Sequence, residues 1–94
     1  MKRYIKTNFE TRSECDSIAS QVEDFLKISD IDYSEVTCET DEFGTDVYVI
    51  MNNGTYRYTR LVNICEQLEA QFHPDICELS DSQDGNEYFY LHWD

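Results

Sequence analysis

The run Val47-Tyr48-Val49-Ile50-Met51 decides the fold, because it is the most apolar and most β-branched stretch of the chain. Residues of these types favour strands, so we expect a central strand here. On its N-terminal side, residues 33–40 alternate between apolar and polar side chains, which predicts a half-buried strand with Val36 and Cys38 facing the core. Residues 41–44, Asp-Glu-Phe-Gly, predict the turn that joins the two strands.

Two helices are predicted from apolar residues at helical spacing. The first spans Thr11 to Ile28, where Thr11-x-x-Glu14 has the spacing of a capping box. The second ends at His73-Pro74, because proline disfavours helical geometry at the residue before it. The apolar positions are Cys15, Ile18, Ala19, Val22 and Leu26 in the first helix and Leu61, Ile64, Cys65, Leu68 and Phe72 in the second. Residues 56–58 are either a short strand or the start of the second helix.

Further strands are predicted at both ends of the chain. Residues 3–9 alternate loosely and predict a first strand, while residues 76–79 and 87–93 flank Asp84-Gly85-Asn86 and predict a terminal hairpin. The order of elements predicts one α+β domain over residues 1–94. Its fold would be an antiparallel sheet of four to five strands with two amphipathic helices on one face.

Charge is the most unusual property of the chain, which holds 20 acidic and 7 basic residues for a formal net charge of −13. Nucleic acids and anionic lipids are polyanions, so this charge disfavours direct binding to DNA, RNA or a membrane surface. The chain also lacks an apolar run of about 20 residues and a signal-peptide core. We therefore expect a cytoplasmic protein.

The four cysteines do not have the spacing of a metal site. Cys15, Cys38, Cys65 and Cys77 form no C-x-x-C pair, and no histidine follows at zinc-finger spacing. Each lies on the apolar side of its local pattern, so reduced, shielded thiols are expected. The acids at 41–46 lack the twelve-residue pattern of a calcium loop. No metal or other cofactor is predicted.

No enzyme motif occurs in the chain. A P-loop, a dinucleotide-binding fingerprint, G-x-S-x-G and H-E-x-x-H are all missing. A cysteine could pair with His73 or His92, and carboxylate pairs are possible, but neither arrangement has a local signature. His73 is better explained by its place at a helix C-terminus, which favours a positive charge. We therefore expect a protein that is not an enzyme.

Acidic residues gather at two places in the sequence, and they are the candidate partner-binding residues. Alternate strand residues lie about 6.6 Å apart on one face, so Glu35, Thr37, Glu39 and Asp41 would form a row. The alternative is a solvated face that only keeps the protein soluble. The candidates are Asp30, Asp32, Glu35, Glu39, Asp41, Glu42 and Asp46 in the first cluster and Glu78, Asp81, Asp84 and Glu87 in the second.

The size, the acidity, the mixed order of elements and the lack of catalytic motifs together resemble small phage-encoded DNA-mimic inhibitors, specifically the Arn-type antirestriction family. The resemblance covers the whole chain through composition and layout. It implies a homodimer or a higher assembly whose carboxylates imitate duplex phosphates. Such an assembly would occupy the DNA site of a restriction enzyme in the host cytoplasm and so evade host defence.

Two functions remain open at this point, besides a small enzyme that uses cysteine or carboxylate chemistry. The first is an acidic inhibitor that competes for the basic nucleic-acid-binding surface of a restriction endonuclease or another DNA-handling protein. The second is a protein–protein adaptor that uses an aromatic sheet face, while the acids only solubilise it. The aromatic residues are Tyr48, Tyr56, Tyr58, Tyr88, Tyr90 and Trp93, of a kind enriched in interfaces.

Overall fold

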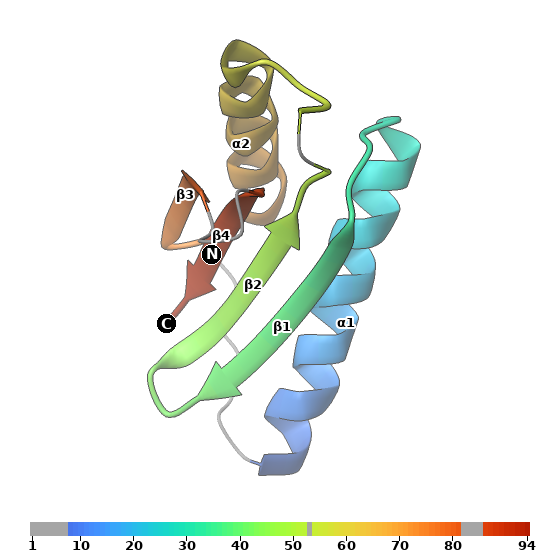
Figure 1. The fold of residues 1–94 in the computed structure, drawn as a ribbon. Helices are drawn as coiled ribbons and strands as arrows, with labels where there is room; N and C mark the ends of the chain where they lie inside the picture. Colours follow the sequence, from blue (N-terminus) through green and yellow to red (C-terminus); the bar gives the residue numbers. More distant parts are fainter. Residues whose placement is uncertain (1–7, 53, 82–85) are drawn as a thin grey trace.

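The computed structural model describes the backbone of residues 8–52, 54–81 and 86–94 and their side chains other than those of 8–16 and 41. The elements are α1 (Asn8–Ile28), β1 (Glu35–Asp41), β2 (Gly44–Ile50), α2 (Tyr58–Phe72), β3 (Ile76–Asp81) and β4 (Glu87–Trp93). In Figure 1, α1 runs along β1, at one edge of the sheet, and α2 packs near β3, at the opposite edge. The predicted α+β fold is confirmed, and its described part has a four-stranded sheet.

The sheet has the strand order β1-β2-β4-β3, and all neighbouring strands are antiparallel. Val47 in β2 lies opposite Cys38 of β1 on one side and opposite Leu91 of β4 on the other. β2 is therefore a central strand, as its apolar run predicts, although it begins at Gly44 and ends at Ile50. β1 and β3 form the two edges.

Helix α1 begins earlier than the sequence pattern predicts. It starts at Asn8, so Thr11 is not its N-cap and the predicted capping box is wrong. In an acid-rich helix, a Thr-x-x-Glu spacing also arises away from the end, because Glu is a good helix former. Asn8 and Phe9 belong to this helix and not to the predicted first strand, whose other residues, 3–7, lie outside the described residues.

The C-terminus of α1 closes with a Schellman arrangement. The amide of Ile31 donates to the carbonyl of Leu26 at 2.8 Å, and that of Asp30 donates to the carbonyl of Lys27 at 3.1 Å. Asp30 occupies the left-handed position with a φ of 57°, where glycine is more usual. Ile31 and Leu26 are both buried in the core. Asp30 thus takes part in a structural turn.

A tight turn joins β1 to β2, as predicted. Asp41 pairs with Gly44, which leaves Glu42 and Phe43 as the loop. Gly44 has a φ of 146° and approaches the end of β4 so closely that a Cβ would meet the carbonyl oxygen of Trp93. Glycine is required at this position because both its conformation and the available space exclude a side chain.

Helix α2 begins at Tyr58, with Arg57 as its N-cap. Residues 56–58 therefore lead into a helix and do not form a strand. At the other end, His73 adopts the left-handed conformation, with φ 52° and ψ 51°, and its amide donates to the carbonyl of Glu69. The predicted stop before Pro74 is confirmed.

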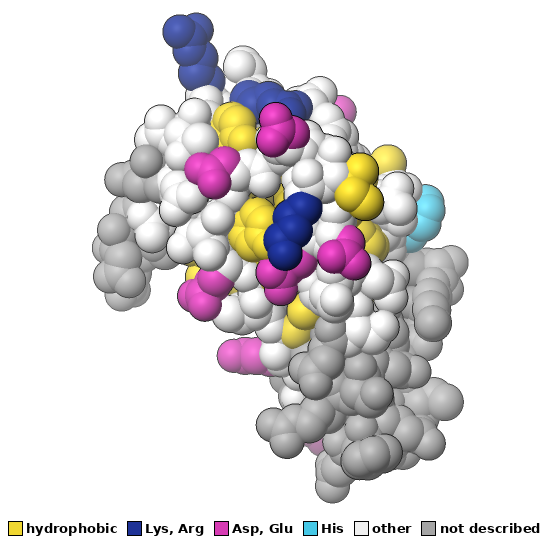
Figure 2. All heavy atoms as spheres, turned by 90° about the vertical axis from the view of Figure 1, so that its right-hand side faces the viewer, with side chains coloured by type: hydrophobic (Ala, Val, Ile, Leu, Met, Phe, Trp, Pro, Cys, Tyr) yellow, Lys and Arg dark blue, Asp and Glu magenta, His cyan; other side chains and the backbone are white. Residues whose placement is uncertain are grey.

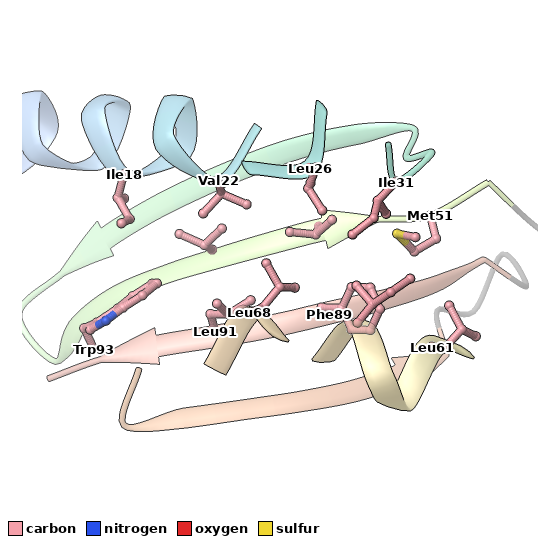
Figure 3. Close-up of a cluster of buried hydrophobic side chains, with 13 residues drawn as sticks. Ile18, Val22, Leu26, Ile31, Met51, Leu61, Leu68, Phe89, Leu91 and Trp93 are labelled. Carbon is pink, nitrogen blue, oxygen red and sulfur yellow. The ribbon is translucent and has the colours of Figure 1, made fainter. Parts of the chain in front are cut away.

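Both helices pack on one face of the sheet and enclose a single apolar core (Figure 3). Ile18, Val22 and Leu26 of α1 share this core with residues of α2, as predicted from their helical spacing. Trp93 adds a hydrogen bond from Nε1 to the carbonyl of Phe72 at 3.1 Å. The core consists of Ile18, Val22, Leu26, Ile31, Val47, Val49, Met51, Leu61, Ile64, Leu68, Phe89, Leu91 and Trp93. Neither described helix is long and apolar enough to cross a membrane.

Candidate functional site

The face of the sheet opposite the helices is the candidate site, and we call it the outer face. Strand side chains alternate between two faces, so the residues next to the buried ones in sequence point away from the core. Neither described helix packs on this face, because both bury their apolar residues on the other one. The outer face consists of Glu35, Thr37, Glu39, Asp46, Tyr48, Ile50, Ile76, Glu78, Ser80, Tyr88, Tyr90 and His92.

Three tyrosines form a band across the two central strands of the outer face. Tyr48 of β2 lies directly opposite Tyr90 of β4, and their ring centroids are 5.2 Å apart. The ring of Tyr88 is 6.0 Å from that of Tyr48. These distances are typical of favourable aromatic pairs. The band gives the centre of the face a rigid, half-buried aromatic surface.

Glutamates stand on both edge strands beside this band. Glu35 and Glu39 lie on β1, and Glu78 lies on β3 opposite Tyr90. All three are exposed, and their carboxylates form no hydrogen bond or ion pair with the residues that the structure describes. They are therefore available to a partner on either side of the tyrosines.

A shallow depression of about 360 Å³ lies at one end of the outer face, near the start of β1 and the end of β2. Tyr48 and Tyr88 line it together with the carboxylate-bearing Glu35. The full lining is Ser34, Glu35, Thr37, Tyr48, Ile50, Asn86 and Tyr88. Aromatic rings and a carboxylate are groups that attract a cation.

Asp46 takes part in a hydrogen-bond network within the outer face. Its Oδ1 accepts a hydrogen bond from the Tyr90 hydroxyl at 2.7 Å and lies 2.6 Å from Nδ1 of His92. The other ring nitrogen of His92, Nε2, lies 2.7 Å from Oδ1 of Asp94. Asp46 therefore holds β2 and β4 together, and its Oδ1 is engaged within the protein.

The environment of His92 favours its protonated form. Burial alone would lower the pKa of His92, but the hydrogen bonds to Asp46 and Asp94 and the charges of both outweigh burial and raise the pKa. The pKa of the Tyr90 phenol is also raised, by burial and by its hydrogen bond to Asp46. Both ring nitrogens of His92 face carboxylates, so neither is free to act as a general base.

The acids of the first predicted cluster do not all share one face. Glu35 and Glu39 lie on the outer face as predicted, and the side chain of Asp41 lies outside the described residues. Asp32 is in the α1–β1 connection, where its carboxylate accepts a hydrogen bond from Asn52 at 3.0 Å. Glu42 is exposed in the β1–β2 turn. With Asp30 in its helix-ending turn and Asp46 on the central strand β2, the cluster is spread over β1, the connections on either side of it, and β2.

The second predicted cluster divides between the two faces of the sheet. Glu78 is on the outer face, whereas Asp81 and Glu87 lie opposite each other on the helix-facing side, in line with Leu79 and Phe89. Asp84 lies outside the described residues. Only Glu78 of this cluster thus joins the candidate site.

Figure 2 views the molecule from the right-hand side of Figure 1, where α1 and β1 lie. On this side, acidic side chains are scattered singly among uncharged ones, and Lys or Arg side chains lie between some of them. Among the side chains that Figure 2 colours by type, the negative charge is not gathered into one dense patch. The outer face differs because its glutamates flank an aromatic band.

The cysteines differ in state. Cys38 is disulfide-bonded, so the prediction that all four cysteines are reduced is wrong. The pattern placed this thiol correctly on the inner side of β1, but it could not show whether another thiol reaches it. Cys65 and Cys77 are free. No group of three or more metal-ligating side chains is found among the residues that the structure describes.

Sequence reasoning missed the network around Asp46 and the depression beside Tyr48. The alternating patterns at 46–50 and 88–92 identify the outward residues of each strand, but they do not show which residues lie opposite each other.

Comparison with family models, with curated proteins and with solved structures finds no match for this chain.

Proposed function

We propose that this protein binds the basic nucleic-acid-binding surface of a DNA-handling protein through its outer face and blocks that surface competitively. The observation that supports this is the band of Tyr48, Tyr88 and Tyr90 between glutamates on both edge strands. An interface commonly has an aromatic centre and a polar rim. Here the rim is acidic, so a complementary partner carries Arg and Lys around an apolar centre.

The chemistry of recognition follows from these groups. Arginine of the partner makes charge-assisted hydrogen bonds to Glu35, Glu39 or Glu78, in place of the bonds that it makes to phosphates. In the depression, its guanidinium also stacks on Tyr48 or Tyr88. The net charge of −13 accelerates the encounter with a basic surface.

The partner class follows from the sign and the arrangement of the charge. A duplex-binding surface carries Arg and Lys because it neutralises phosphates. The resemblance to Arn-type antirestriction proteins makes a restriction endonuclease in the host cytoplasm the first partner to test. Of the predicted acid row, Glu35 and Glu39 lie on the outer face, so the mimic would be an acidic patch with a tyrosine centre.

The second candidate is an adaptor that uses the same tyrosine band without its acids. It is favoured by the ring contacts at 5.2 and 6.0 Å, which give a rigid surface suited to ordinary association. The two functions differ in their dependence on salt. Screening weakens binding through carboxylates and leaves an apolar interface largely unchanged.

The test uses competition with DNA. The protein is immobilised, a partner is captured from a bacterial lysate, and the purified partner is bound to a fluorescent duplex. The wild type should displace the duplex, and less well at 500 mM than at about 50 mM NaCl. The variant E35Q/E39Q/E78Q should lose about tenfold in potency, because three exposed charge pairs of about 0.5 kcal/mol each sum to about 1.5 kcal/mol.

The matched control removes the same three charges elsewhere. Asp24, Glu66 and Glu69 are exposed on the helices, and D24N/E66Q/E69Q should displace the duplex almost as well as the wild type. Equal loss in both variants would show that only net charge matters. Full potency of the outer-face variant would reject the proposed inhibitor and favour the adaptor.

A further inference from the structure

Two free thiols lie in contact where α2 packs against β3. Cys65 of α2 and Cys77 of β3 are 12 residues apart, and their Sγ atoms are 3.3 Å apart. Sγ of Cys77 also lies 3.5 Å from the carbonyl oxygen of Cys65. Both side chains are half-buried, so solvent-borne reagents reach them. Neither thiol belongs to the outer-face site.

The connection between α2 and β3, which lies between the two cysteines, is fixed to the end of β4, so the fold itself brings the thiols together. The amide of Asp75 donates to the carbonyl of His92 at 2.8 Å, and the carboxylate of Asp75 accepts a hydrogen bond from the amide of Asp94 at 2.8 Å. Trp93 fixes the end of α2 through the carbonyl of Phe72. A disulfide needs the sulfurs at about 2.05 Å, so they must move about 1.2 Å closer.

The two sulfurs have different roles. The hydrogen bond between them lowers the pKa of Cys65, and it outweighs burial and the charges of Glu66, Glu69 and Glu78. The same hydrogen bond and burial raise the pKa of Cys77. Cys65 is thus the thiol that ionises first, and its thiolate is the nucleophilic form, while Cys77 keeps its proton.

We propose that Cys65 and Cys77 form a reversible dithiol site that exchanges with low-molecular-weight disulfides such as oxidised glutathione. The Cys65 thiolate attacks one sulfur of the small disulfide, forms a mixed disulfide and releases one small thiolate. Cys77 then loses its proton to this thiolate or to water and attacks Sγ of Cys65, which releases the second small thiol. Two protein thiols are oxidised to one disulfide, and the small disulfide is reduced to two thiols.

Formation of the mixed disulfide at Cys65 favours the later attack by Cys77. Cys77 is held protonated mainly by its bond to Cys65 and by burial, with the charge of that thiolate adding to the effect. The bond and the charge disappear once Cys65 carries a mixed disulfide. The product joins α2 to the edge strand that carries Glu78 and removes conformational freedom from the unfolded chain.

The test measures the disulfide directly. The full chain is equilibrated in buffers of increasing oxidised-to-reduced glutathione ratio, alkylated, and digested after glutamate, because cleavage at Glu66 and Glu69 separates the two cysteines. The peptide pair linked through Cys65 and Cys77 should rise to become the major species and disappear with dithiothreitol. The oxidised protein should also unfold at a higher urea concentration.

Two variants test the roles of the sulfurs. Cys77→Ser should accumulate glutathione on Cys65, because no second thiol resolves the mixed disulfide. Cys65→Ser should leave Cys77 to react several-fold more slowly. If Cys65 and Cys77 of the wild type remain fully alkylated in oxidised glutathione, or if each pairs instead with another cysteine, the proposal is wrong.

Discussion

At the scale of single residues, adding a methyl group at Gly44 should destabilise the protein more than adding one at Gly54. The φ of 146° at Gly44 is unfavourable for other residues, and a Cβ there would meet the Trp93 carbonyl and lie 2.6 Å from Cε1 of His92. We expect Gly44→Ala to lower the free energy of unfolding by about 2–4 kcal/mol, through backbone strain and overpacking together. Urea denaturation followed by circular dichroism measures this loss.

Gly54 provides the control for Gly44. It has a positive φ of 78°, but a Cβ there meets no atom within 4 Å. Gly54→Ala should therefore lower the free energy of unfolding by only about 1–2 kcal/mol, which is the strain of a non-glycine residue at positive φ. Equal losses in the two variants would show that the close approach of Gly44 to β4 contributes nothing.

At the scale of elements, Asp46, Tyr90 and His92 join β2 to β4 on the outer face. The pKa of His92 is raised in the folded protein, so the native state binds this proton more tightly than the unfolded chain does. The resulting stability is fully present below the ordinary pKa of about 6.5 and is lost as pH rises through the raised value. We therefore expect His92→Gln to destabilise the protein more at pH 6 than at pH 9.

The measurement is urea unfolding of the wild type and of His92→Gln at both pH values. The loss at pH 6 should be about 1–3 kcal/mol, as for hydrogen bonds to a charged group. Asp46→Asn and the double variant complete a double-mutant cycle. The coupling free energy between Asp46 and His92 should likewise be smaller at pH 9 than at pH 6. A coupling that is unchanged or larger at pH 9 would contradict the protonated state of His92.

The elements differ in how well their sequences predict them. Helix α2 and both hairpins were predictable, because apolar spacing, His73-Pro74 and the turn residues act locally. The start of α1 was not, since Thr11-x-x-Glu14 also fits a helix interior. The pairing of β2 with β4 joins residues 38 to 48 positions apart, from Ile50 with Tyr88 to Thr45 with Trp93, and no local pattern encodes it. The network of Asp46 and the disulfide state of Cys38 depend on such packing and were missed for that reason.

At the scale of the molecule, acidic residues that are close together in the sequence lie at different places in the fold. Asp30 ends a helix, Asp46 binds His92, and Asp81 and Glu87 lie toward the helix side of the sheet. Glu35, Glu39 and Glu78 remain on the outer face and flank the tyrosines. The homodimer implied by the resemblance to Arn-type proteins remains a prediction. The central claim is therefore that these three glutamates, and not the helix acids, meet the partner.

Carboxylate footprinting tests this claim most directly. The free protein and its complex with the captured partner are labelled with carbodiimide and glycine ethyl ester, and the modified residues are quantified by mass spectrometry. We predict that the complex protects Glu35, Glu39 and Glu78 several-fold, while Glu66 and Glu69 of α2 label at unchanged rates. Protection of the α2 glutamates with full labelling of the outer face would contradict the account.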